Sequence, residues 1–198
     1  MAKITVEMIQ NLREKTGIGM MDCKKALEEA GGDPEKAIQL LRKRGEKVAL
    51  KRSGQATKNG LVHAYIHPGA NLGVLVEISC ESDFSANTDA LKNFAHDVCM
   101  QIAACHPVAV SPEDVDIARI ESEKEIYRSQ LKESGKPEMV IEKIVEGKLN
   151  KFYETVCLME QKFIKNDSIT IRDHLNELVA KVNENIKVKR FVRFEIGS

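Results

Sequence analysis

The sequence predicts an α+β protein, in which a small three-helix domain precedes a larger domain with an antiparallel three-stranded sheet covered by helices. Two observations predict this class. The first part of the chain carries apolar residues at helical spacing between glycine-rich breaks, whereas residues 60–80 show the period of two typical of strands. The chain has 198 residues, of which 42% are hydrophobic, enough for one large or two small domains. We therefore expect one domain at residues 1–53 and a second at residues 54–198.

The first domain is predicted from the starts and ends of its three helices. Thr5 is a suitable N-cap for the first helix, and residues 16–19 (Thr-Gly-Ile-Gly) end it with glycines that tolerate a left-handed turn. The second helix is expected from about residue 20 to residue 30. The third begins at Asp33-Pro34, a cap followed by a proline in the first helical turn. Three short helices in this arrangement are typical of a ubiquitin-associated domain, a module that usually binds a partner.

The adjacent Met20 and Met21 stand at the start of the second helix. Neighbouring helical residues point about 100° apart, so one of the pair is expected near the surface. A flexible, polarisable methionine side chain suits an adaptable partner contact.

Residues 46–58 are polar and rich in Lys, Arg, Gly and Ser, and the composition predicts a linker. The basic residues in and before this stretch are Arg42, Lys43, Arg44, Lys47, Lys51 and Arg52. No aromatic residue is interleaved to stack on bases, so we interpret the cluster as a solvated helix end and expect no nucleic acid as partner.

The second domain is organised around a strand, a turn and a helix between residues 71 and 105. A first strand is expected at residues 60–67 and a hairpin turn at residues 68–71. The central strand follows, because the apolar residues Leu72, Val74, Val76, Ile78 and Cys80 alternate along it. After the turn, a helical stripe is formed by Leu91, Phe94, Ala95, Val98 and Ile102.

The turn at residues 81–88 carries Asp83 and Phe84 side by side. Its Ser, Asn and Thr residues are all plausible N-caps. Phe84 has two interpretations that the local pattern leaves open. It can be a hydrophobic staple that packs back on the following helix. Alternatively, an aromatic and a carboxylate on a rigid corner can form a protruding wedge, since loops held by a scaffold concentrate recognition residues.

The C-terminal part is expected to be mostly helical and to end in a strand. Residues 107–166 are predicted largely helical, apart from a break at residues 134–137 (Ser-Gly-Lys-Pro). The apolar pattern predicts another helix at residues 169–185. Residues 186–196 alternate again and supply the third strand of the sheet.

Composition narrows the function classes. The chain has 30 basic and 30 acidic residues, so no global field draws it to nucleic acid or membrane. No apolar run approaches the roughly 20 residues of a membrane-spanning helix, and the first residues lack the apolar segment of a signal peptide, so we expect a cytoplasmic protein. The five cysteines include no CxxC pair, and buried reduced thiols are the expectation rather than a metal site. Neither a metal nor a cofactor is predicted.

An enzyme is the first alternative function. Cys105-His106, or another of the cysteines, could supply a nucleophile. No oriented triad or phosphate-binding motif accompanies them, so we do not predict an enzyme.

Two stretches resemble signatures of the bacterial elongation factor Ts family. Residues 12–27, LREKTGIGMMDCKKAL, are similar to its N-terminal signature, and residues 77–87, EISCESDFSAN, are similar to its second signature. Shorter similarities to the short form of the family lie at residues 135–137, 142–148, 158–161 and 190–195. The resemblance therefore covers essentially the whole chain.

This resemblance implies a guanine nucleotide exchange factor that binds GDP-bound and nucleotide-free elongation factor Tu and releases GDP during translation elongation. In the family, an Asp-Phe pair enters the partner's nucleotide domain near its magnesium site, displaces the ion and loosens the phosphate loop. The residues implied here are Ser82, Asp83, Phe84 and Ser85 for the wedge and Met20 and Met21 for docking. The family usually has Thr and Val where this chain has Ser82 and Ser85.

Longer members of the family contain two related copies of the core subdomain, whereas this chain has one strand-turn-helix unit. We therefore predict a homodimer in which a second chain supplies the missing copy. A general binding module is the second alternative function, and it differs in expecting residues 1–53 alone to account for partner binding.

Overall fold

The computed structural model describes residues 4–132 and 137–197 and shows the expected α+β class. The chain divides into two compact units. The first contains the residues up to His63 together with Glu77–His96 and Arg172–Lys189. The second contains Ala64–Val76, Asp97–Ile171 and the residues from Arg190 onward. Neither unit is a continuous segment, so the domain boundary expected at residue 53 stays a prediction.

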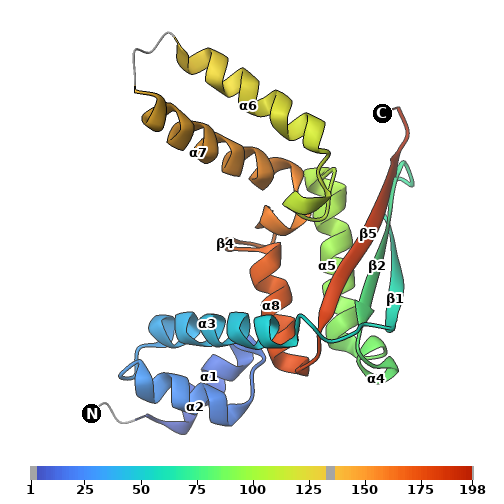
Figure 1. Cartoon of the computed structure of the whole chain (residues 1–198). Helices are drawn as coiled ribbons and strands as arrows, with labels where there is room; N and C mark the ends of the chain where they lie inside the picture. Colours follow the sequence, from blue (N-terminus) through green and yellow to red (C-terminus); the bar gives the residue numbers. More distant parts are fainter. Residues whose placement is uncertain (1–3, 133–136, 198) are drawn as a thin grey trace. The chain divides into compact units, whose positions relative to one another are not determined.

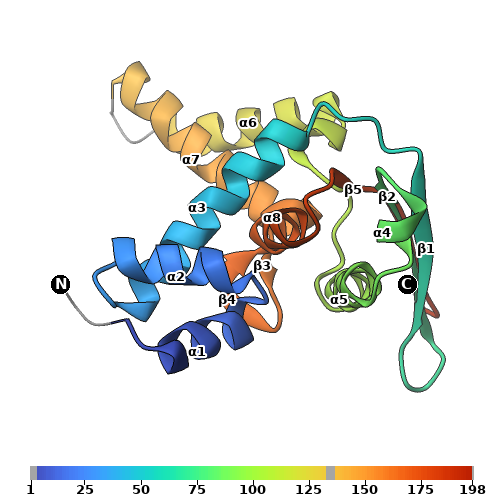
Figure 2. The ribbon, with the colours of Figure 1, turned by 90° about the horizontal axis from the view of Figure 1, so that it is seen from below.

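Three helices open the chain, as predicted: α1 (Val6–Thr16), α2 (Met20–Glu29) and α3 (Pro34–Arg52) (Figures 1 and 2). Their caps are those expected. The Thr5 hydroxyl accepts a hydrogen bond from the Met8 amide at 3.2 Å, and Asp33 accepts two before α3. Gly17 ends α1 with a φ of 66°, a left-handed conformation that favours glycine. The buried core of these helices consists of Ile9, Leu12, Cys23, Ala26, Leu27, Ala37 and Leu41.

The prediction of a linker from residue 46 was wrong over its first half, because α3 continues to Arg52. Residues 46–52 contain no glycine or proline and consist mostly of good helix formers, so nothing stops the helix before Ser53 and Gly54. The helix also gains a tertiary partner. Gly45 is buried, and a Cβ atom added to it would lie 3.4 Å from the carbonyl oxygen of Asn176 in α8 (Ile171–Val182).

The main sheet is antiparallel and consists of β1 (Asn59–Ile66), β2 (Leu72–Cys80) and β5 (Ile186–Glu195) in the order β1-β2-β5. The three predicted strands are confirmed to within a residue or two. The inward side chains of β2 are almost completely buried, with Val76 at 0% exposure. Helix α5 (Asp89–Cys105) carries the predicted apolar stripe and lies along one face of the sheet (Figure 1).

A helical hairpin follows α5 and belongs to the second unit. The short η1 (Pro112–Asp114) leads into α6 (Ile117–Lys132), which runs beside α7 (Glu138–Val156) in Figure 1. Arg128 on α6 and Glu142 on α7 form a two-pronged ion pair with hydrogen bonds of 2.7 and 2.9 Å. Most of the predicted break at residues 134–137 lies outside the described residues.

The prediction of helix up to residue 166 was wrong for its last ten residues. After α7 the chain forms η2 (Leu158–Glu160) and a second sheet of two antiparallel strands, β3 (Lys162–Phe163) and β4 (Asn166–Thr170). The buried Gln101 of α5 explains the departure. Its amide nitrogen donates to the Lys162 carbonyl at 3.0 Å, and its amide oxygen accepts from the Ile164 backbone at 2.9 Å. Helix α8 consequently begins at residue 171 rather than 169.

Candidate partner-binding site

The segment between β2 and α5 forms a single turn of helix, α4 (Asp83–Ala86). Ser82 is its N-cap, because the Ser82 hydroxyl accepts a hydrogen bond from the Ser85 amide at 3.2 Å. Thr88 caps α5 in the same way, accepting from the Leu91 amide at 3.3 Å. Both residues belong to the set of caps expected from the sequence. The consequence is a capped helical corner in place of an irregular turn.

Asp83 and Phe84 are exposed on this corner, whereas Ser85 behind them is buried. The Phe84 side chain is 78% exposed. A hydrophobic staple covers its apolar group by packing it on the adjacent helix, and Phe84 is not covered. The geometry therefore favours the second of the two interpretations, a ring held out into solvent. Ser82 is half-buried, so the four predicted wedge residues fall into an exposed pair and a supporting pair.

Ser82 is tied to a residue far away in the sequence. Its backbone amide donates to one carboxylate oxygen of Glu184 at 3.0 Å, and its hydroxyl donates to the other oxygen at 2.6 Å. Burial works against the Glu184 carboxylate, but the hydrogen bonds from Ser82 and Ser85 outweigh it and hold the pKa of Glu184 below its ordinary value. The charged form of Glu184 is therefore the one that anchors the corner.

A cavity of about 600 Å³ opens beside α4, between the start of β1 and the start of α5. Asp83 lines it together with two cationic side chains, Lys58 and Lys92. Asp83 therefore borders a recess with both polar and apolar walls, and its exposed side chain can make charge or hydrogen-bond interactions.

The two methionines predicted to dock on a partner, Met20 and Met21, differ in exposure. Met21 is 65% exposed at the start of α2, whereas Met20 is partly buried against the core of the three helices. Met21 is thus the one available for contact. It stands on α2, and Phe84 stands on α4, two elements of the same compact unit.

Sequence reasoning missed the residues that hold the corner, namely Glu81, Glu184, Asn185 and Arg52. Glu184 follows Ser82 by 102 positions. No local pattern predicts such a contact, because both residues look like ordinary polar positions next to strand ends.

Burial disfavours the reactive thiolate form at Cys99, Cys105 and Cys157. Four of the five cysteines are buried and Cys105 is exposed. Burial raises the pKa of Cys99 to about 12, that of Cys157 to about 11, and that of Cys105 above its ordinary value. Reactive cysteines have lowered pKa values, so the enzyme alternative gains no support. In the described part of the chain, no group of three or more His, Cys, Asp or Glu residues could hold a metal ion.

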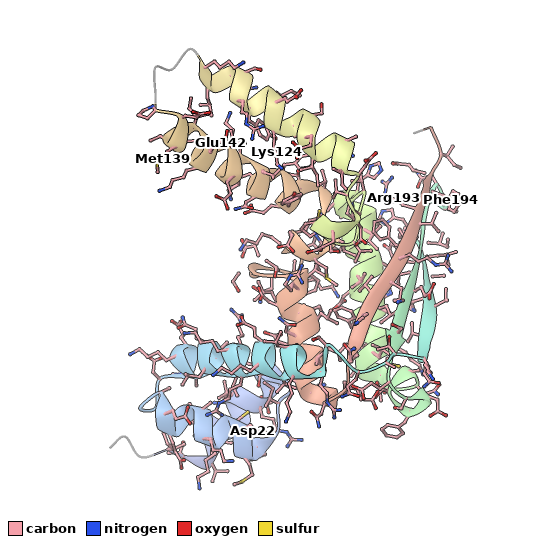
Figure 3. All side chains as sticks on the ribbon, in the orientation of Figure 1. Asp22, Lys124, Met139, Glu142, Arg193 and Phe194 are labelled. Atoms are coloured by element: carbon pink, nitrogen blue, oxygen red, sulfur yellow. The ribbon has the colours of Figure 1, made fainter. Side chains whose placement is uncertain are left out.

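The outer face of the sheet, on the side away from α5, carries exposed apolar side chains. We call the following residues of the second unit the outer sheet face: Ile66, Leu75, Val192, Phe194 and Ile196. Phe194 is 67% exposed, and Figure 3 shows it on the opposite side of β5 from Arg193, whose guanidinium donates to the carbonyl oxygen of Ala103 on α5. Within residues 4–132 and 137–197, no helix is long and apolar enough to cross a membrane.

The similarity to known proteins extends over essentially the whole chain. The family model described as elongation factor TS matches residues 5–198. The chain is 57% identical over 194 residues to elongation factor Ts of Carboxydothermus hydrogenoformans, covering 98% of this chain and 89% of the relative. It is 52% identical over 197 residues to that of Desulfosudis oleivorans, covering 100% of both, and 53% identical over 195 residues to that of Thermotoga petrophila, covering 98% and 97%.

Proposed function

The chain belongs to the elongation factor Ts family, and on that premise we propose that it is a cytoplasmic guanine nucleotide exchange factor for elongation factor Tu that promotes GDP release during translation elongation. The observation that carries the proposal is the Phe84 ring, 78% exposed on a capped helical turn. Large apolar groups held rigidly in solvent are typical anchors of protein interfaces. The family match, which extends over residues 5–198, supplies the identity of the partner's class.

Exchange of this kind needs no covalent chemistry. A protein that lowers the affinity of its partner for GDP must itself be bound more weakly by the GDP form, because the coupling between two ligands is reciprocal. This chain therefore binds nucleotide-free elongation factor Tu more tightly than the GDP form, and each binding event shifts GDP towards release.

Asp83 and Phe84 form the wedge in this proposal. Phe84 enters an apolar part of the partner's nucleotide domain, and Asp83 acts by charge near the magnesium site. Ser82 and Ser85 support the pair, since Ser82 caps α4 and Ser85 is buried beneath it. The wedge is short, so its direction depends on how α4 is held.

The N-terminal helices dock on the same partner domain through Met21, with Met20 beneath it. Two separate anchor points, on α2 and α4, distinguish this function from a general binding module. Such a module would bind through residues 1–53 alone, whereas the exchange factor needs both anchors.

We also propose that the chain is a homodimer that buries the outer sheet face. Although the opposite face of the sheet is the buried one, this outer face still exposes large apolar side chains, with Phe194 at 67% and Ile196, just beyond the end of β5, at 80% exposure. Exposed apolar patches of this kind mark interaction sites. A second copy can cover the face with its own, because a two-fold interface pairs a surface with itself.

Release of a fluorescent GDP analogue from elongation factor Tu tests the proposed function. The parent chain should accelerate release, and Phe84→Ala should lose most of that acceleration. A matched control is Ile117→Ala, which removes an equally exposed apolar side chain, 76% exposed, from α6. Unchanged release with the parent chain, or equal activity of the two variants, would reject the proposal.

A further inference from the structure

Three segments far apart in the sequence meet at Glu184 and Asn185, between α8 and β5. Helix α8 ends at Val182, and the next residue, Asn183, has a left-handed φ of 56° that turns the chain out of the helix. The next residue, Glu184, accepts two hydrogen bonds from Ser82, one on each carboxylate oxygen, at 3.0 and 2.6 Å. A carboxylate held on both oxygens fixes the direction as well as the position of the group it binds.

Asn185 makes the second connection. Its side chain is buried, and its amide nitrogen donates to the carbonyl oxygens of Ser53 at 3.2 Å and Gln55 at 2.7 Å, just beyond the end of α3. Its backbone amide donates to the Glu81 carboxylate at 2.6 Å. Glu81 is in turn 3.5 Å from Arg52, the last residue of α3. Asn185 thus joins the end of the docking helices to the residue that precedes the wedge.

Helix α8 also contacts α3 directly, at residues that precede Glu184 by about two turns of helix. Arg42 of α3 forms an ion pair with Glu177 of α8 at 3.4 Å, and both side chains are about two-thirds covered. Gly45 allows the two helices to approach closely, next to the carbonyl oxygen of Asn176. The last helix of the docking domain is therefore fastened to the same helix that delivers Glu184 to the wedge. All of these residues belong to one compact unit.

We propose that Glu184 and Asn185 are positioning residues for nucleotide exchange, in which Glu184 aims the Asp83–Phe84 turn and Asn185 fixes that turn to the docking helices. This inference rests on the proposed function. A helix of four residues has little internal rigidity, so without the Glu184 anchor the ring samples many directions. Without Asn185, the two anchors on α2 and α4 no longer bind as a pre-oriented pair, and the gain from linking them is reduced.

The two residues should therefore affect different kinetic parameters. Glu184→Ala should lower the maximal GDP-release rate about tenfold and raise the half-saturating concentration by a smaller factor, because docking through Met21 is intact. Glu184→Gln keeps one acceptor oxygen for Ser82 and should retain roughly a third of the maximal rate. Asn185→Ala should instead raise the half-saturating concentration about fivefold. Glu146→Ala on α7, an exposed glutamate outside this network, is the matched control.

The experiment measures GDP release over a range of exchange-factor concentrations, a thermal melt, and amide hydrogen exchange of Ser82 for each variant. Faster exchange at Ser82 in Glu184→Ala, with a lowered maximal rate measured well below the melting transition, supports the proposal. Partial rescue by Glu184→Gln supports it further, and this variant carries the test if the alanine variant does not fold. A parent-like maximal rate in both Glu184 variants overturns it.

Failure of this inference and failure of the proposed function look different. If Phe84→Ala loses activity while the Glu184 and Asn185 variants match the Glu146→Ala control, the wedge stands and the positioning role is wrong. If the parent chain does not accelerate GDP release at all, the proposed function fails, and the positioning role fails with it.

Discussion

The substitution Phe→Ala at two positions ten residues apart should give opposite phenotypes. Phe84 lies on α4 and is 78% exposed, whereas Phe94 lies on α5 and is 2% exposed. The same number of atoms is removed in both cases. The difference in outcome therefore reports what each ring does.

For Phe94→Ala, the loss of buried apolar surface and the cavity left behind should lower the free energy of unfolding by about 3 to 5 kcal/mol. In a chain of 198 residues this corresponds to a melting temperature roughly 6 to 20 °C lower. The Phe94 ring also contacts His174 of α8 at 5.1 Å between ring centroids, so a contact across the unit is lost as well.

In Phe84→Ala, the removed ring was already mostly exposed to water in the folded protein, so little buried surface is lost. The melting temperature should therefore stay within a few degrees of that of the parent. The loss appears in partner binding instead. Truncating an interface anchor typically costs about 2 kcal/mol or more, roughly thirtyfold in affinity for elongation factor Tu.

The assay combines a thermal melt with GDP release measured well below the transition of each variant. The expected result is a stable but inactive Phe84→Ala protein and an unstable but active Phe94→Ala protein. A Phe84→Ala protein that melts much earlier and still releases GDP at the parent rate would refute the reasoning, because it would place that ring in the core.

Three further changes test other parts of the molecule. Met21→Asp should weaken binding to elongation factor Tu about tenfold or more without changing the melting temperature, because a carboxylate is costly in an apolar contact; calorimetric titration measures this, and parent-like affinity would contradict the docking role. Phe194→Asp should halve the molecular mass seen by light scattering at micromolar concentration; a parent that is already monomeric and fully active would rule out the dimer. Alkaline pH should destabilise the fold: the pKa of Cys99 is raised to about 12 and that of Cys157 to about 11, so above the ordinary value of 9.0 the unfolded chain loses thiol protons that the folded chain keeps. The free energy of unfolding should fall by an amount on the order of 1 kcal/mol per pH unit for each thiol until its folded pKa is reached. Denaturant titrations at pH 8 to 11 should show that the free energy of unfolding falls less steeply with pH in Cys99→Ala than in the parent.

The sequence predicts a helix or strand well when the periodicity of its apolar residues agrees with the turn signals on either side of it. The strand at residues 72–80 was predicted to the residue, because one face is buried and a hairpin fixes its start. The small sheet of β3 and β4 was not predicted. Its backbone takes its form from the distant side chain of Gln101, and a contact of that kind leaves no periodic signal near residue 162.

In the candidate site, too, some features follow from the local sequence and others depend on distant contacts. Ser82 and Thr88 were recognisable as caps, since a hydroxyl before a helix satisfies free backbone N–H groups wherever it occurs. The exposure of Phe84 could not be derived, because an aromatic residue before a helix is equally compatible with packing on it. The anchor at Glu184 was beyond local inference, since its partner is more than a hundred residues away.

The hydrogen bonds between Ser82 and Glu184 also set the order in which this protein becomes competent during its own synthesis. The buried core of α1 to α3 is built from residues 9–41 alone, so all of its side chains are present once about 50 residues have left the ribosome. The wedge has to wait until residue 184 has emerged, near the end of the chain. A nascent chain should therefore pass through a long interval in which its first three helices are complete but the turn that carries Asp83 and Phe84 lacks its anchor.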